Sequence, residues 1–280
     1  MTIWLMIAGA VALLATFVWR ELRTAEPIVP MGLFRNHVFS VTSGIGFIVG
    51  FAMFGAIIFL PLFLQIVRGS SPTTAGLEML PMMAGLLFAS VLSGRLISRI
   101  GRYKVFPIIG TALATIAMFL LSTMTITTPY WQIALYMLLL GLGIGNVMQV
   151  LVLAVQNSVN PKDVGVATSG ATFFRSIGGT FGTTIFGAVM VNGIDRNLAE
   201  TLPPGSTGGI DPAQLTNSMS TINSLPTDIR DLVLGAFTNS LSNVFLTAVP
   251  ILVVAFVLAH FLKDARLRGV GDHEIPTLME

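Results

Sequence analysis

Long runs of apolar residues, separated by shorter polar connections, dominate this sequence of 280 residues. A helix needs about 20 apolar residues to cross the hydrocarbon core of a bilayer. The runs do not alternate apolar and polar positions as the strands of a membrane barrel do. The pattern predicts an all-α integral membrane protein with seven transmembrane helices, at approximately 2–19, 38–67, 76–97, 105–124, 131–155, 164–191 and 243–262.

The connections between these runs indicate an orientation, because Lys and Arg collect in cytoplasmic loops. If the connection between the third and fourth runs is cytoplasmic, the side of every other connection follows by alternation. The predicted cytoplasmic set is Arg20, Arg23, Arg35, Arg95, Arg99, Arg102, Lys104, Lys162, Lys263, Arg266 and Arg268, and the predicted outside set is Arg68, Arg196 and Arg230. This bias predicts an N-terminus outside and a C-terminus in the cytoplasm.

Composition narrows the function classes. Only 10% of the residues are charged and 54% are hydrophobic, whereas soluble domains carry about 25% charged residues. The chain has no cysteine, which excludes disulfides and thiolate metal sites. Its three histidines are far apart in sequence, and no phosphate-binding loop or nucleophile elbow occurs, so we expect no metal, no cofactor and no enzyme activity. The basic residues flank apolar runs, which argues against nucleic-acid binding.

The stretch GRLISRIGRYK, residues 94–104, gathers basic residues in a short connection between two apolar runs. It resembles the loop motif of the major facilitator superfamily, G-x-L-x-D-R-x-G-R-[RK]-[RK]. The matching residues are Gly94, Leu96, Arg99, Gly101, Arg102 and Lys104, while Arg95 fills a variable position and Ser98 stands where the acidic residue is expected. In that superfamily the motif joins the second and third helices of a six-helix half. The resemblance therefore implies that the run 2–19 precedes such a half.

Two further segments, LFLQIVRGSSPTTAGLEMLP and FFRSIGGTFGTTIFGAV, resemble segments of the fourteen-span drug/proton antiporters of that superfamily. The resemblance covers nearly the whole chain, but only the second half of such a transporter. It implies a linking transmembrane helix and cytoplasmic linker at 1–37, followed by a C-terminal six-helix bundle at 38–265. The bundle contains a long extracellular segment at 192–242, and a cytoplasmic tail occupies 266–280.

The function implied by this resemblance is that of the C-terminal half of a proton-coupled multidrug efflux transporter that works by alternating access. The expected partners are small hydrophobic or cationic drug-like substrates, protons, the lipid bilayer and a missing N-terminal six-helix half. The expected location is the bacterial plasma membrane. The alternative is a non-transporting membrane subunit, or a truncated remnant, that packs with a partner half.

The loop motif has two interpretations. Gly94 and Gly101 allow close backbone approach and a tight turn. The basic residues can pair with carboxylates or with helix C-termini, and the resemblance implies that such contacts hold one conformation of two bundles. In the other interpretation the same residues only fix the topology.

Arg175 lies within the sixth run, about 18 Å along the helix from its cytoplasmic end. Ionisable side chains at that depth are costly and often functional. Helical spacing places Arg175 on a small and polar face, which we expect to pack against protein or to line water. That face comprises Thr168, Ala171, Thr172, Arg175, Gly178, Gly179 and Gly182, whereas Phe174, Ile177, Phe181 and Ile185 are expected to meet lipid. Arg175 is a candidate partner for an anionic substrate group or for an acid of the missing half. Pairing with backbone carbonyls is the structural alternative.

Three other polar positions are weaker candidates. Asn146 and Gln149 lie in the fifth run, which by the resemblance lines the central cavity together with the second run; interhelical hydrogen bonding is the alternative. Glu78 begins the third run at the outer surface and is a candidate titrating group, although the interface would solvate it.

Apolar residues between Ile229 and Phe237 have helical spacing. They predict an amphipathic helix that rests on protein or lipid, or acts as a substrate gate.

Overall fold

The computed structural model describes residues 31–201 and 227–264, together with the isolated positions 9, 12, 13, 16, 19 and 20. The predicted first helix at 2–19 and the predicted tail at 266–280 therefore fall almost entirely outside the described residues. Within the described ranges the regular structure is helical, and 6 helices are long and apolar enough to cross a membrane. The all-α prediction is confirmed for this part of the chain, and the count of seven stays a prediction.

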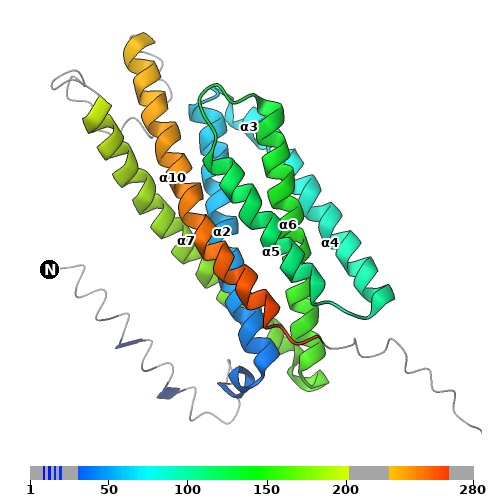
Figure 1. Cartoon of the computed structure of the whole chain (residues 1–280). Helices are drawn as coiled ribbons and strands as arrows, with labels where there is room; N and C mark the ends of the chain where they lie inside the picture. Colours follow the sequence, from blue (N-terminus) through cyan, green and yellow to red (C-terminus); the bar gives the residue numbers. More distant parts are fainter. Residues whose placement is uncertain are drawn as a thin grey trace, which may run out of the picture.

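The helices follow the predicted runs closely (Figure 1). A short 3-10 helix, η1, precedes the first long helix, and another, η2, precedes α7. A short α-helix, α3, leads into α4, and these two elements together form one candidate span. The elements in chain order are η1 (Met31–Arg35), α2 (His37–Ile66), α3 (Pro72–Glu78), α4 (Leu80–Ile100), α5 (Val105–Ser122), α6 (Tyr130–Ser158), η2 (Pro161–Asp163), α7 (Val164–Thr201) and α10 (Thr227–His260).

Local sequence explains where several helices begin and end. The side chain of Asn36 caps α2 by accepting a hydrogen bond from the Val38 amide at 3.0 Å. Ser71 caps α3 in the same way, and Pro72 occupies its first position, where a missing N–H costs nothing. Gly101 ends α4 with a φ of 73°, a left-handed conformation that glycine adopts without strain. The tight turn predicted at Gly101 is confirmed.

The segment 192–242, expected as one long outer connection, is helical at both ends. α7 continues to Thr201, and α10 begins at Thr227. Hydropathy falls after 191, where the predicted run ends, but the helical spacing of apolar residues continues through the buried Ile194 and Leu198. The helix predicted between Ile229 and Phe237 is confirmed as the first part of α10. Phe237 is buried, so this helix packs on protein.

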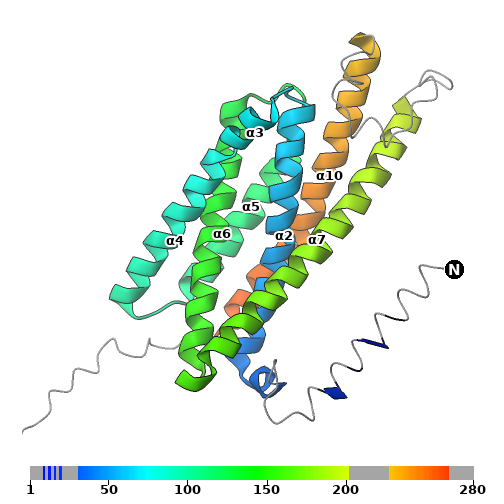
Figure 2. The same ribbon diagram turned by 180° about the vertical axis from the view of Figure 1, so that it is seen from behind.

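The bundle is held by close contacts between helix backbones. α2 packs against α7 and α10, α5 packs against α6 and α10, and α4 packs mainly on α6. From behind, α7 runs beside α2 and meets α6 near the end that carries η2 (Figure 2). A Cβ added to Gly85 in α4 would lie 2.5 Å from the main-chain oxygen of Leu138 in α6, and one added to Gly141 would overlap the main chain at Met82. Small residues of this kind let membrane helices approach each other.

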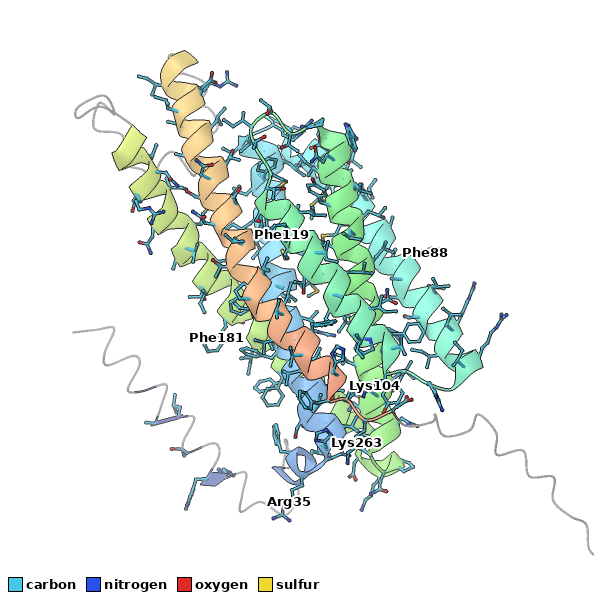
Figure 3. The ribbon with its side chains drawn as sticks, viewed as in Figure 1. Arg35, Phe88, Lys104, Phe119, Phe181 and Lys263 are labelled. Atoms are coloured by element: carbon cyan, nitrogen blue, oxygen red, sulfur yellow. The ribbon has the colours of Figure 1, made fainter. Side chains whose placement is uncertain are left out.

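The outer surface of the bundle is apolar between its two ends, and most of its basic side chains lie at one end. Figure 3 shows Phe88, Phe119 and Phe181 pointing away from the bundle, while the basic side chains that it labels lie at the lower end. Such a surface would be a liability in water, but it suits contact with lipid. Large apolar side chains that are more than half exposed include Leu77, Leu80, Leu87, Phe88, Ile100, Phe119, Trp131 and Phe181.

Candidate functional site

Arg175 lies where α7 meets α2 and α6. It lines a small cavity of about 20 Å³, which is room for about one water molecule. The helices supply mainly apolar side chains around it. The lining residues are Thr42, Gly46 and Val49 of α2, Val147, Met148, Leu151 and Val152 of α6, and Ala171, Thr172 and Arg175 of α7. Within this bundle, the guanidinium therefore sits beside a space too small for a drug-sized molecule.

Glycines bring α7 directly onto α2. A Cβ added to Gly178 would overlap the main-chain oxygen of Phe47, and one added to Gly50 would overlap the main-chain oxygen of Arg175. The two backbones thus touch, and the position of the Arg175 main chain is fixed by α2. The prediction that the small face of this helix packs against protein is confirmed at Gly178 and Gly182.

The opposite face of α7 is only partly as predicted. Phe181 and Ile185 are exposed, as expected for side chains that meet lipid. Phe174 is half-buried instead, because its ring packs edge-on against Phe34 with the centroids 5.5 Å apart. The 3-10 helix η1 supplies Phe34, and the sequence did not predict that η1 folds back onto α7.

The side chain of Arg175 is half-buried, and within the described ranges it makes neither a hydrogen bond nor an ion pair. The structural alternative, pairing with backbone carbonyls, is therefore not realised among the described residues. A guanidinium presents five donors and remains charged. It is thus available to an anionic group that comes from outside this bundle.

A larger groove opens on the flank of α7 that faces α6. Its volume is about 650 Å³, within the range of about 300–1,000 Å³ typical of small-molecule sites. Thr172 lines both this groove and the Arg175 cavity, so the two spaces adjoin. The groove is lined by Gln156, Val164, Gly165, Thr168, Ser169, Thr172, Phe173 and Ser176. Sequence analysis placed Thr168 and Thr172 on the face of Arg175 but did not predict the groove.

The chemistry of this groove favours ligands that donate hydrogen bonds or carry positive charge. The hydroxyls of Ser169 and Thr172 donate to main-chain oxygens one turn earlier, at 2.9 and 3.0 Å. With their hydrogens engaged, their oxygens are left as acceptors toward the groove. Gln156 bridges α6 and α7 by donating to the Thr168 hydroxyl at 3.3 Å.

Asn146 and Gln149 do not join Arg175. The Asn146 carboxamide donates to the main-chain oxygen of Leu142 in its own helix at 2.9 Å, and its Cβ lies near Gly110 of α5. Gln149 is exposed on α6 and has no hydrogen bond within the described ranges. Neither residue lines the cavity or the groove described above. Their role in lining a central cavity stays a prediction.

Glu78 lies at the end of the bundle opposite the basic loop, where it ends α3. Its carboxylate accepts a hydrogen bond from the Ser70 hydroxyl at 2.8 Å, and its main-chain oxygen accepts one from the Tyr130 hydroxyl at 3.0 Å. The Arg68 guanidinium lies 5.5 Å from the centre of the Tyr130 ring. These contacts tie the neighbouring ends of α2, α3 and α6 together, which is a structural role. The titrating role stays a prediction.

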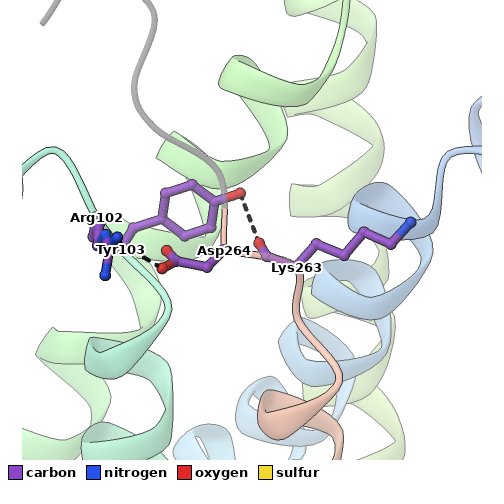
Figure 4. A network of polar contacts seen from close by, with 4 residues as sticks. All are labelled: Arg102, Tyr103, Lys263 and Asp264. Carbon is purple, nitrogen blue, oxygen red and sulfur yellow. Dashed lines mark hydrogen bonds and ion pairs between the residues drawn. The ribbon is translucent and has the colours of Figure 1, made fainter.

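The basic loop between α4 and α5 is fastened to the end of α10 (Figure 4). The Tyr103 hydroxyl donates to the main-chain oxygen of Lys263 at 3.2 Å, and Arg102 Nε lies 3.7 Å from Asp264 Oδ2. Tyr103 is fully buried, whereas the ion pair is exposed. In one of the two interpretations these basic residues reach carboxylates or helix C-termini of a neighbouring bundle, but Arg102 pairs with Asp264 of its own bundle.

Two further contacts close the same end of the bundle. The Asn36 carboxamide donates to the main-chain oxygen of Ser158 at 2.7 Å, which joins the start of α2 to the end of α6. A ring nitrogen of His37 lies 3.0 Å from the main-chain oxygen of Phe261, at the end of α10. Polar contacts thus link α2, α6, α10 and the loop between α4 and α5 at this end.

The remaining basic residues of the loop have no such partners. Within the described ranges, Arg95, Arg99 and Lys104 make neither hydrogen bonds nor ion pairs through their side chains. Ser98, which replaces the acidic residue of the motif, donates its hydroxyl to the Gly94 oxygen of its own helix at 2.9 Å. A Cβ added to Gly94 would meet nothing within 4 Å, so the close approach expected there does not occur among the described helices.

Sequence reasoning missed Tyr103. It occupies a motif position where a basic residue is expected. A lone aromatic residue between two basic residues was the available signal, since tyrosine buries its ring while its hydroxyl finds a polar partner.

Comparisons with known proteins agree with this architecture. A sequence profile described as Major Facilitator Superfamily matches residues 2–183. An MFS-type transporter of Mycobacterium tuberculosis is 45% identical over 267 residues, which cover 95% of this chain and 38% of the relative. A multidrug transporter protein of Bacillus subtilis is 35% identical over 280 residues, covering 91% of this chain and 51% of the relative.

A tetracycline resistance determinant of Streptomyces rimosus is 32% identical over 289 residues. That alignment covers 94% of this chain and 83% of the relative. The chain thus spans between about two fifths and about half of the length of the first two relatives, and most of the third. These relatives are named for transport or drug resistance, and the first two are named as transporters rather than enzymes.

Proposed function

The chain belongs to the Major Facilitator Superfamily, and from this premise we propose that it is the C-terminal half of a proton-coupled multidrug efflux transporter. It is an integral membrane protein of a transporter family, not an enzyme. In this proposal it works together with a second six-helix half, and the two halves alternate access to a site between them.

The relatives support the substrate class and the need for a second half. One relative is named as a multidrug transporter and another as a tetracycline resistance determinant. The chain covers 51% of the first of these. A chain that spans one six-helix bundle of such a transporter needs another to enclose a substrate. We therefore propose small hydrophobic or cationic drug-like molecules as substrates.

The observation that carries the proposal is the groove on α7 beside Arg175. It is large enough for a drug-sized molecule and presents hydroxyl oxygens as acceptors, which suits a cationic substrate. The adjoining guanidinium has no partner within the described ranges. In the proposed transporter this flank of α7 faces the second half, and Arg175 pairs with an anionic group there.

The proposed proton coupling needs an acid within the membrane. The acids within the described spans are Glu78, Asp163, Asp195 and Asp231, and each lies near an end of its span. A carboxylate that carries a proton through the membrane therefore has to come from the second half. Protonation of that acid would weaken its pairing with Arg175 and so couple proton movement to the arrangement of the two halves.

We further propose that the basic end is cytoplasmic and that the membrane is the bacterial plasma membrane. Arg35, Lys104 and Lys263 lie at the same end of the bundle (Figure 3). Basic residues favour the cytoplasmic side. The bacterial relatives support the choice of membrane.

A chimera tests the function. The aligned segment of the Bacillus subtilis multidrug transporter is replaced by this chain, and efflux of a cationic dye is measured in a pump-deficient bacterial strain. The parent transporter is the positive control. Collapse of the pH gradient with an exchanging ionophore tests proton coupling.

Dye efflux that stops when the pH gradient is collapsed would support the proposal. A chimera that inserts in the membrane in normal amounts but exports no dye would favour the alternative, a non-transporting subunit or remnant. Efflux that persists without the pH gradient would reject proton coupling while retaining transport.

A further inference from the structure

A second groove runs between α7 and α10, away from the flank that faces α6. Its volume is about 610 Å³. α7 contributes Ile185, Ala188, Val189, Asn192, Gly193 and Arg196, and α10 contributes Asn243, Leu246 and Thr247. It shares no residue with the groove beside Arg175. Phe181, one turn before Ile185 on α7, is 54% exposed on the outside of the bundle (Figure 3). The groove thus continues the apolar outer surface of the bundle, which suits contact with lipid.

The walls of the groove are fixed by direct contacts between the two helices. A Cβ added to Gly193 would lie 3.0 Å from Ser240 of α10, so the helices are close at that level. The Asn197 carboxamide donates to the Ser240 hydroxyl at 3.0 Å. The groove is thus a built feature of the α7–α10 pair.

Polarity changes along the groove. Ile185 and Leu246 supply exposed apolar surface, at 42% and 48% exposure. Asn192 lies about two turns and Arg196 about three turns beyond Ile185 along α7. Asn243 lies about one turn beyond Leu246 toward the same end. The site therefore pairs an apolar stretch with a polar, positively charged mouth.

The mouth lies at the level expected for lipid headgroups. Asn243 is about 25 Å along α10 from His260 at the basic end, at a rise of about 1.5 Å per residue. The hydrocarbon core is about 30 Å thick. Asn192 and Arg196 lie farther along α7, past the length needed to cross that core. The polar mouth thus crosses the boundary of the leaflet opposite the basic loop, from about 5 Å inside the core at Asn243 to beyond the core at Arg196.

The polar groups at the mouth are suited to an anion. The carboxamides of Asn192 and Asn243 make no hydrogen bonds within the described part of the chain, so their N–H donors are available. Arg196 adds a positive charge and a planar set of donors that fits phosphate oxygens.

We propose that this groove binds a phospholipid of the leaflet opposite the basic loop. The phosphodiester is held by Arg196, Asn192 and Asn243, and an acyl chain lies along Ile185 and Leu246. The occupant is a phospholipid, because the site combines anion recognition at headgroup depth with an apolar stretch that opens sideways into the bilayer. The proposal requires only that the chain spans the membrane, and does not depend on drug transport.

The test counts lipids bound to the full-length chain, purified in detergent, by native mass spectrometry. The probes are a phosphatidylglycerol and a diacylglycerol with the same acyl chains, which lacks the phosphate. Two variants address the two parts of the groove: Arg196→Gln removes the charge, and Ala188→Trp fills the space. Arg35→Gln, which removes an exposed charge at the other end, is the matched control.

We expect phosphatidylglycerol to bind at least about fivefold more tightly than the diacylglycerol. Arg196→Gln and Ala188→Trp should each weaken its binding by about fivefold or more, and Arg35→Gln should not. Melting temperatures equal to that of the unmodified chain establish that the variants fold. Equal binding of the two probes, or unchanged binding in both groove variants, would overturn the proposal. Since no transport is measured, this outcome is separate from the failure of the proposed function.

Discussion

The hydroxyl of Tyr103 donates a 3.2 Å hydrogen bond to the main-chain oxygen of Lys263, across 160 positions of sequence. The bond joins the loop between α4 and α5 to the residues that follow α10. Because the ring is fully buried while neighbouring Arg102 is exposed, the aromatic residue is the anchor and the ion pair is secondary. The basic loop is therefore part of its own bundle and presents its unpaired charges from a fixed position.

Removing this anchor should loosen that end of the bundle. Tyr103→Phe loses one hydrogen bond and should lower the free energy of unfolding by about 1 kcal/mol. Tyr103→Ala also leaves a cavity and should cost about 3–5 kcal/mol. Arg102→Gln breaks only an exposed ion pair and should cost about 1 kcal/mol or less. Unfolding of the purified chain by denaturing detergent measures the free energies of all three variants. Equal losses of stability in Tyr103→Ala and Arg102→Gln would contradict the conclusion that Tyr103 is the anchor.

The close contact of α7 with α2 predicts a contrast between two glycines. Gly178→Ala would place a methyl group onto the Phe47 main chain, so the helices must separate, at a cost of about 1–3 kcal/mol. Gly94→Ala meets open space in helix α4 and should be neutral or stabilise by up to about 1 kcal/mol. The same unfolding measurement compares them. Destabilisation by Gly94→Ala would mean that another segment packs closely there.

Much of this fold could be predicted from the sequence, because hydropathy and helix length are local properties. The six described spans and the packed face of Gly178 followed from apolar runs and helical spacing. The end of α7 did not, since hydropathy fell at 191 while burial of Ile194 and Leu198 against the rest of the protein kept the helix regular. Tertiary packing, which no local window contains, decided that boundary.

The candidate site was less predictable, because it depends on which helices meet. Arg175 could be identified from depth alone, but spacing placed Asn146 near Gln149 without showing that Asn146 turns toward α5. The two grooves arise where hydroxyl and carboxamide groups of different helices adjoin. The anchor Tyr103 depends on the position of Lys263, far away in sequence. Predicting the grooves or the Tyr103 contact would require knowing how the helices are placed relative to one another.

The proposed orientation can be tested by labelling, since the chain has no cysteine of its own. Single cysteines at Arg99→Cys and Thr127→Cys replace exposed residues at opposite ends of the bundle. In intact cells, a membrane-impermeant maleimide should label the cysteine at position 127 and spare the one at position 99. Both should react after the membrane is permeabilised. Labelling only at position 99 in intact cells would show that the orientation is the reverse of the one proposed.

Arg175 should matter for transport more than for stability. Arg175→Met keeps an unbranched stem for contact with Gly50 but removes the charge, and Arg175→Lys keeps the charge. In the dye-efflux chimera, Arg175→Met should reduce efflux about tenfold, equivalent to about 1.4 kcal/mol, while Arg175→Lys retains part of the activity. The guanidinium makes no hydrogen bond within the described ranges, so both variants should unfold within about 1 kcal/mol of the parent. Normal efflux by Arg175→Met would remove Arg175 from the site. Loss of stability in proportion to loss of efflux would instead assign it a structural role, since a charge that only pairs with an anionic group of the second half leaves the folding of this bundle unchanged.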